Sequence, residues 1–97
     1  MATTPEQAER ILSLLADETC STRKMMGEYL LYKQGVLIGG IYDGRLLFKP
    51  GPALSALLPG APAVSPYPGA KAMILAEKPE ALPLPEALKA AYADHKK

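Results

Sequence analysis

The strongest constraint on the fold is the dipeptide Asp43-Gly44, which lies between two runs rich in aliphatic and aromatic residues. A type I′ turn needs positive φ at both central residues, and Asp-Gly is among the dipeptides that adopt it most readily. The flanking runs, Val36–Tyr42 and Arg45–Lys49, therefore predict two antiparallel strands. Gln34-Gly35 separates them from a third run, Arg23–Lys33, so we predict a three-stranded antiparallel meander.

A capped amphipathic helix is predicted before the meander. Thr4-Pro5-Glu6-Gln7 combines an N-cap threonine, a first-turn proline and a glutamine that can complete a capping box. Apolar residues then recur at the spacing of one helix face, which indicates a stripe directed at a core. These residues are Ala8, Ile11, Leu12 and Leu15.

Prolines divide the second half of the chain, because proline fits the first turn of a helix and cannot continue one. Pro52 opens a predicted short helix that Pro59-Gly60 ends, and Pro85 opens a last helix. Between them, Ala63–Tyr67 is predicted as a weak edge strand and Lys71–Glu77 as a better strand. The predicted connection is a type II turn over Tyr67-Pro68-Gly69-Ala70.

The predicted order is helix, three strands, helix, two strands, helix, in a single domain over residues 1–97. We expect a two-layer α+β fold with an antiparallel sheet. Pairing Lys33 with Val36 and Tyr42 with Arg45 assigns each strand residue to one face, because side chains alternate at period two. The more aliphatic face is expected under the helices: Met26, Glu28, Leu30, Tyr32, Leu37, Gly39, Ile41, Leu46 and Phe48.

The second predicted face mixes tyrosines, cations and aliphatic residues, which is the character of a protein–protein patch. Its residues are Gly27, Tyr29, Leu31, Ile38, Gly40, Tyr42, Arg45, Leu47 and Lys49. Two alternatives stay open: helices cover both faces, or the register slips by one residue.

The residues that carry most enzyme chemistry are scarce. The chain has one histidine, His95, expected in a solvated tail, and one cysteine, Cys20, beside Asp17-Glu18. Acidic neighbours raise a thiol pKa, and one Cys with one His cannot build a zinc site. Glu28, an acid on an apolar face, is expected to pair with a nearby arginine or lysine. We predict a non-enzymatic protein without catalytic residues, metal or cofactor.

Charge and hydropathy bear on partners and location. The formal net charge is +1 and the pI about 7.8, which argues against direct nucleic-acid binding. No apolar run approaches the roughly 18–20 residues of a membrane span, and the N-terminus lacks the features of a secretory signal. The single cysteine favours a reducing compartment, so a cytoplasmic protein is expected.

The block from Arg23 to Pro50 closely resembles the N-terminal domain of the TfoX (Sxy) competence regulators. The residues that carry the resemblance begin with Arg23-Lys24-Met25-Met26-Gly27 and continue through Tyr29, Tyr32, Ile41, Asp43, Arg45, Leu46 and Lys49. The later run Tyr67–Met73 looks like that family's segment before its last strand. The resemblance covers essentially the whole chain, as a stand-alone N-terminal domain; the short proline-rich middle is a departure, typical of a compact subgroup.

The resemblance implies a fold similar to that of secretion chaperones and a role akin to coactivation of competence genes. We expect a protein-binding regulator that acts as a homodimer or with another protein partner. The alternative is a module that binds a peptide or an anionic metabolite. The candidate binding residues are Arg23, Lys24, Tyr29, Tyr42, Arg45 and Lys49.

Overall fold

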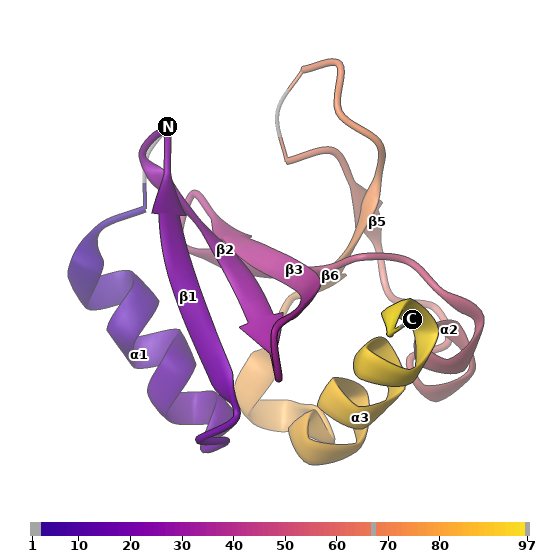
Figure 1. The fold of residues 1–97 in the computed structure, drawn as a ribbon. Coiled ribbons are helices and arrows are strands. Elements are labelled where there is room, and N and C mark those ends of the chain that lie inside the picture. The colour runs from indigo at the N-terminus through magenta and orange to yellow at the C-terminus, as the bar shows by residue number, and fades with distance from the viewer. Residues whose placement is uncertain (1–2, 67, 97) are drawn as a thin grey trace.

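The computed structural model describes residues 3–66 and 68–96. Its elements are α1 (Pro5–Leu15), β1 (Cys20–Met25), β2 (Glu28–Lys33), β3 (Val36–Tyr42), β4 (Arg45–Phe48), α2 (Pro52–Leu57), β5 (Ala63–Val64), β6 (Met73–Ala76), the 3-10 helix η1 (Pro79–Ala81) and α3 (Leu84–His95). The strands form one six-stranded antiparallel sheet in the order β1-β2-β3-β4-β6-β5. The helices lie on one side of this sheet, which confirms the predicted α+β class (Figure 1).

Local signals in the first helix and in two hairpins are confirmed. Thr4 caps α1 and forms the capping box with Gln7. The turns between β2 and β3 and between β3 and β4 each place two successive residues at positive φ, as a type I′ turn requires. Asp43, for example, has φ +54° and Gly44 has φ +71°.

The predicted strand over Arg23–Lys33 is wrong, because the chain turns back at Met26-Gly27 and forms the β1–β2 hairpin instead. The meander therefore has four strands, with Cys20–Met25 at one edge of the sheet. Met26 adopts φ +52° and Gly27 φ +83°. Methionine is an unusual residue at such a position, which is why the sequence carried no strong turn signal there.

The predicted assignment of faces is partly wrong, and the open alternative of a one-residue slip is the one observed. A bulge between Leu31 and Tyr32 pairs Leu31 with Gly39 and Tyr29 with Ile41. β2 is thereby shifted against β3, so Leu31 and Tyr29 face the helices. Ile38 also lies in the core. It is joined there by three residues that were predicted to face the helices: Ile41, Leu46 and Phe48.

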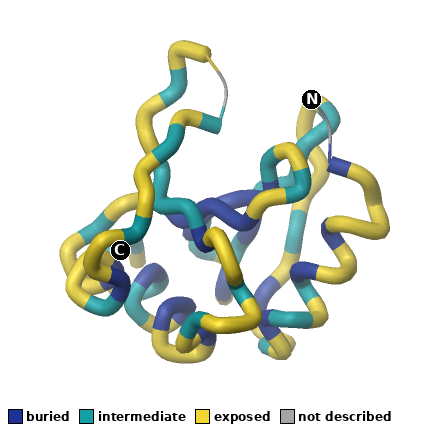
Figure 2. Tube along the Cα trace, turned by 180° about the vertical axis from the view of Figure 1, so that it is seen from behind, coloured by how far each residue is buried: buried dark blue, intermediate teal, exposed yellow. Residues whose placement is uncertain are grey.

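The core lies between the sheet and the helices. α1 contributes Ile11 and Leu15, and α3 contributes Leu88 and Ala91, all buried. Gly39 allows close strand packing, because a Cβ there would overlap the carbonyl oxygen of Leu47. Figure 2 shows buried segments concentrated in this layer, whereas the connections around it are exposed.

The second half of the chain follows the predicted order with shorter strands. α2 begins at Pro52 and ends before Pro59, as expected. The Asp94 carboxylate of α3 accepts hydrogen bonds at 3.0 Å from the backbone N–H groups of Ala53 and Leu54, so α3 caps α2. Tyr67 of the predicted type II turn lies outside the described residues, and Gly69 of that turn has φ +88°.

Candidate functional site

The face of the sheet opposite the helices carries two adjoining hollows. The larger, about 540 Å³, lies beside the β1–β2 hairpin and is lined by Met25, Met26, Glu28, Leu30, Tyr42, Asp43, Arg45, Pro66 and Pro68. The smaller, about 340 Å³, is lined by Leu30, Leu37, Gly39, Tyr42, Lys49, Pro50, Pro66, Ala70, Lys71, Ala72 and Met73. Leu30, Tyr42 and Pro66 line both, so we treat the two hollows as one depression, the open-face trough.

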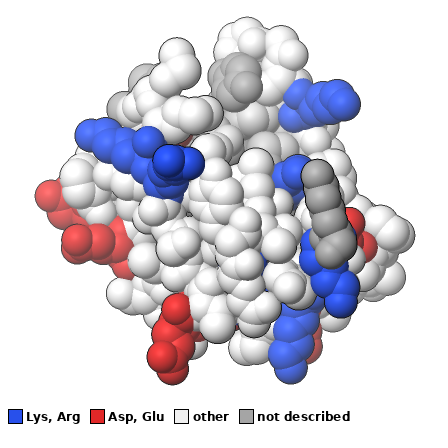
Figure 3. All heavy atoms as spheres, in the orientation of Figure 1, with Lys and Arg blue, Asp and Glu red and all other residues white. Residues whose placement is uncertain are grey.

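Two raised segments border the trough. One is the tip of the β1–β2 hairpin, and the other is the connection between β5 and β6, which rises from the sheet (Figure 1). Met26 at the hairpin tip is 95% exposed. In the space-filling view, Lys and Arg side chains lie on both upper sides of the molecule, with uncharged atoms between them (Figure 3). The trough is therefore concave, with an apolar floor and charged surroundings.

Side-chain packing positions the floor of the trough. A Cβ at Gly40 would fall within 3.0 Å of the Tyr42 ring, so the missing side chain leaves space that the ring occupies. Leu30 is half-buried beside this ring, opposite Gly40 in the sheet. Gly40 thus allows a tyrosine to lie across the sheet, which a larger residue at this position would prevent.

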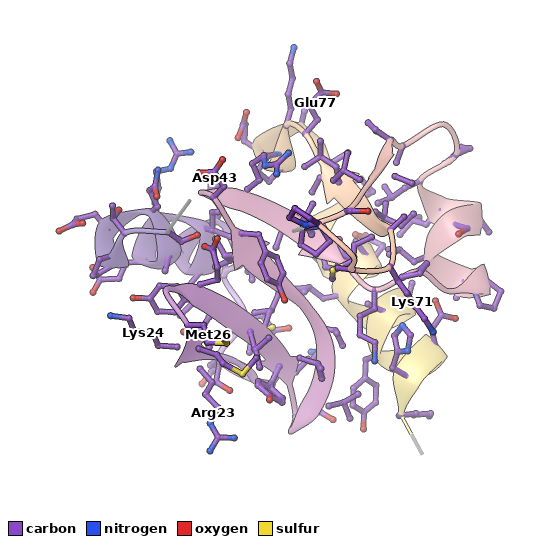
Figure 4. All side chains as sticks on the ribbon, turned by 90° about the horizontal axis from the view of Figure 1, so that it is seen from above. Arg23, Lys24, Met26, Asp43, Lys71 and Glu77 are labelled. Carbon is purple, nitrogen blue, oxygen red and sulfur yellow. The ribbon has the colours of Figure 1, made fainter. Side chains whose placement is uncertain are left out.

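The structure brings three of the predicted binding residues together and separates the others. Tyr42 and Arg45 line the larger hollow, and Tyr42 and Lys49 line the smaller one. Arg23 and Lys24 are exposed on the edge strand β1 and point away from the trough (Figure 4).

Tyr29 does not belong to the site. It packs against the core on the helix side of the sheet, because the bulge at Ile38 of β3 shifts the β2–β3 register by one residue. The prediction that placed Tyr29 beside Tyr42 is therefore wrong for the same reason as the face assignment.

Sequence reasoning did not place the following residues in the site: Leu30 on the floor, and Met25, Met26, Pro66, Pro68 and Lys71 in or beside the two borders. The prolines were interpreted only as breaks between elements. Met26-Gly27 did hold a signal, since glycine is favoured at a turn position with positive φ. Because methionine is unusual at the first position of such a turn, the dipeptide was not interpreted as one. The exposure of Met26 follows only once the hairpin is known.

Glu28 does not form the expected ion pair. The Thr3 hydroxyl donates to Glu28 Oε1 at 2.5 Å, and the backbone N–H of Asp43 donates to the same oxygen at 3.1 Å. Thr3 also accepts a hydrogen bond from the N–H of Gly44 at 3.1 Å. Glu28 therefore ties the N-terminal segment and the β3–β4 turn to one end of the trough.

The remaining ionisable groups of interest lie away from the trough. Cys20 is buried, and burial together with the nearby Asp17 raises the pKa of its thiol to about 11, so the thiolate is not formed at neutral pH. Hydrogen bonds from Lys33 and Thr19 hold the pKa of Asp17 well below its usual range. His95 is not a solvated tail, because its Nε2 atom is buried and has no hydrogen-bond partner in the structure.

Two features are absent from residues 3–66 and 68–96. No cluster of three or more His, Cys, Asp or Glu side chains is placed to hold a metal ion. None of the helices in these ranges has the length and apolar character to cross a membrane.

Comparisons of the chain with protein-family models, with curated proteins and with solved structures find no match. The resemblance to the TfoX N-terminal domain therefore stays a prediction from the residues quoted above.

Proposed function

We propose that this protein is a non-enzymatic regulator that binds another protein through the open-face trough. The observation that carries the proposal is Met26, a large apolar side chain that is 95% exposed at a backbone φ of +52°. An L-residue in this left-handed region costs roughly 1–2 kcal/mol, and asparagine or glycine tolerates it better. A methionine here brings no benefit to folding, whereas it offers an adaptable contact to a partner.

The composition of the trough supports the same function. Its borders hold two methionines and two prolines, and Tyr42 lies on its floor. Methionine adapts to irregular partner surfaces, and tyrosine is enriched in protein interfaces because it combines apolar area with a polar end. The larger hollow, at about 540 Å³, has room for several apolar side chains.

The biological setting rests on the sequence resemblance. We propose a cytoplasmic regulator of the competence-coactivator type, in which the trough contacts a component of the transcription machinery. In this setting the chain works by binding protein, and its near-neutral charge leaves few cations for DNA phosphates.

A second candidate function is favoured by one observation. Lys49 and Lys71 both line the smaller hollow, and no carboxylate does. A small anionic metabolite would be attracted to such a site. Native mass spectrometry of the purified protein tests this: a retained small molecule that is lost in Lys49→Ala supports the metabolite module over the protein-binding regulator.

Affinity capture from the native cell tests the main proposal. Three tagged proteins are compared: the wild type, Met26→Asn, which suits the turn but removes the apolar contact, and Ala93→Arg, a change at an exposed position on α3. We expect a partner that is held by the wild type and by Ala93→Arg, weakened by Met26→Asn, and reconstituted with purified components. Binding that Met26→Asn and Tyr42→Ala both leave unchanged would show that the trough is not the interface.

Analytical ultracentrifugation separates this proposal from the expected homodimer. A monomer at high micromolar concentration agrees with a trough that awaits a different protein. A dimer that Met26→Asn dissociates would make a second copy of the chain the occupant instead.

A further inference from the structure

The two ends of the trough differ in charge. At the end lined by the smaller hollow, Lys49 and Lys71 supply two cations and no acidic residue contributes to the lining. Within residues 3–66 and 68–96, neither lysine forms an ion pair. At the other end, Glu28 and Asp43 line the larger hollow together with Arg45. Figure 4 shows Asp43 and Lys71 on opposite sides of the open face.

The hydrogen bonds at the mixed end reduce its ability to bind a charged partner. Glu28 Oε1 already accepts from Thr3 and from the N–H of Asp43. Arg45 lines the same hollow as both acids, whose negative charges offset its attraction for a further anion. The lysine end is therefore the part of the trough with a net positive charge, whereas two acids and one arginine line the methionine end, which has the larger hollow.

The shape of the trough selects the form of its occupant. Its two borders rise above the sheet, at the β1–β2 hairpin and at the β5–β6 connection (Figure 1). A single helix or extended segment of another protein can enter between the borders and reach Leu30 and Tyr42.

We infer that the trough binds a single acidic and apolar segment of a partner protein. Its apolar side chains enter the hollow beside Met25 and Met26, and its Asp or Glu side chains lie over Lys49 and Lys71. This inference rests on the proposed function and specifies the chemistry of the partner. It also specifies which part of the segment lies at each end of the trough, because only one end is cationic.

Selection from a displayed library of random 12-residue peptides tests the inference on the full-length folded chain. Three immobilised proteins are used: the wild type, the double variant Lys49→Glu with Lys71→Glu, and a control with Lys78→Glu and Lys89→Glu. The control reverses two exposed lysines that line neither hollow of the trough, so it matches the change in net charge. Circular dichroism confirms that each variant is folded before selection.

We expect the wild type and the control to enrich peptides that combine large apolar residues with Asp or Glu. The trough variant should instead bind those peptides about tenfold more weakly by fluorescence anisotropy, since two attractive pairs become repulsive. Adding salt should reduce the difference in peptide affinity between the wild type and the trough variant.

Each other outcome contradicts a different statement. Apolar peptides without a preference for acids, or acidic peptides bound equally by the trough variant, would overturn the acidic segment and leave the protein-binding function standing. If Met26→Asn weakened the binding of none of the selected peptides, both the acidic segment and the proposed protein-binding function would be overturned. Self-association of the wild type that Lys49→Glu with Lys71→Glu abolishes would identify a second copy as the occupant and overturn the inference.

Discussion

The two faces of the sheet are made by the same strands but from different kinds of residue. Towards the helices, β2, β3 and β4 present Leu31, Ile38 and Phe48, each with no exposed surface. Towards the trough, the neighbouring positions are half-buried Leu30 and Tyr42, with prolines and lysines around them. One face is filled by this chain alone, whereas the other keeps apolar surface accessible. The contrast indicates that the helix face supplies most of the stability, and it agrees with the proposed recognition on the open face.

Adjacent leucines on β2 give the largest expected contrast. Leu31→Ala leaves a cavity in the core and should lower the free energy of unfolding by about 2–5 kcal/mol. Leu30→Ala removes the same atoms from the half-buried side and should cost about 1 kcal/mol. Urea denaturation of the two variants measures both values. Equal losses would show that the open face contributes as much to stability as the core does.

Gly39→Ala tests how closely the strands beneath the helices are packed. The added Cβ would overlap the backbone of Leu47 in β4, so β3 must shift to accommodate it. We expect a loss of about 1–3 kcal/mol in unfolding free energy, which is the usual cost of overpacking. Gly35→Ala gives the cost of a positive φ alone, since a Cβ there meets nothing within 4 Å. An unchanged unfolding free energy for Gly39→Ala would contradict the close packing.

The ion pair of Lys33 and Asp17 anchors the helix face to the end of α1, at an N–O distance of 2.6 Å. Because the pKa of Asp17 is lower in the folded protein than in the unfolded chain, this carboxylate stabilises the fold above about pH 4 and the contribution is lost as the pH falls through the folded-state pKa. Asp17→Asn should therefore be less stable than the wild type at pH 7. The difference in stability between the two proteins should decrease in acid, as thermal unfolding at a series of pH values would show. A difference that stays constant with pH would argue against the lowered pKa.

Met26→Asn has the smallest expected effect on stability and the opposite sign. Asparagine tolerates the φ of +52° better than methionine does and forms a favourable Asn-Gly turn with Gly27. We expect a gain of about 0.5–1 kcal/mol in unfolding free energy, together with weaker partner binding. Thermal unfolding checks the first and titration with a selected peptide the second. A destabilised variant would show that Met26 supports the fold.

Sequence reasoning predicted most of the fold because its signals were local. The capping box at Thr4 and the Asp43-Gly44 turn each depend on a few neighbouring residues, and both are confirmed. The faces were harder, because residues 29–32 are apolar or aromatic throughout and their alternation cannot say which side is buried. The bulge at Ile38 in the β2–β3 pairing decided that question, and neither the turn nor the alternation of residue types signals it.

The site was only partly predictable for a related reason. Tyr42 and Arg45 flank a turn that the sequence revealed, so their proximity followed from local structure. Pro66 and Lys71 come from a connection far along the chain, and their place beside Leu30 depends on β6 pairing with β4. No local sequence pattern predicts that pairing. Tyr29 was assigned to the wrong face because a one-residue shift in strand register places a side chain on the opposite face of the sheet.

The cap that α3 gives to α2 has a consequence for biosynthesis. Asp94 accepts hydrogen bonds from Ala53 and Leu54, which precede it by 41 and 40 residues. While the ribosome is still making the chain, the β1–β4 meander can close through contacts between neighbouring strands. α2 is translated soon afterwards, yet it remains uncapped until Asp94 has been added and α3 has docked. Pulsed hydrogen exchange on ribosome-bound chains should therefore protect β3 before residues 52–57.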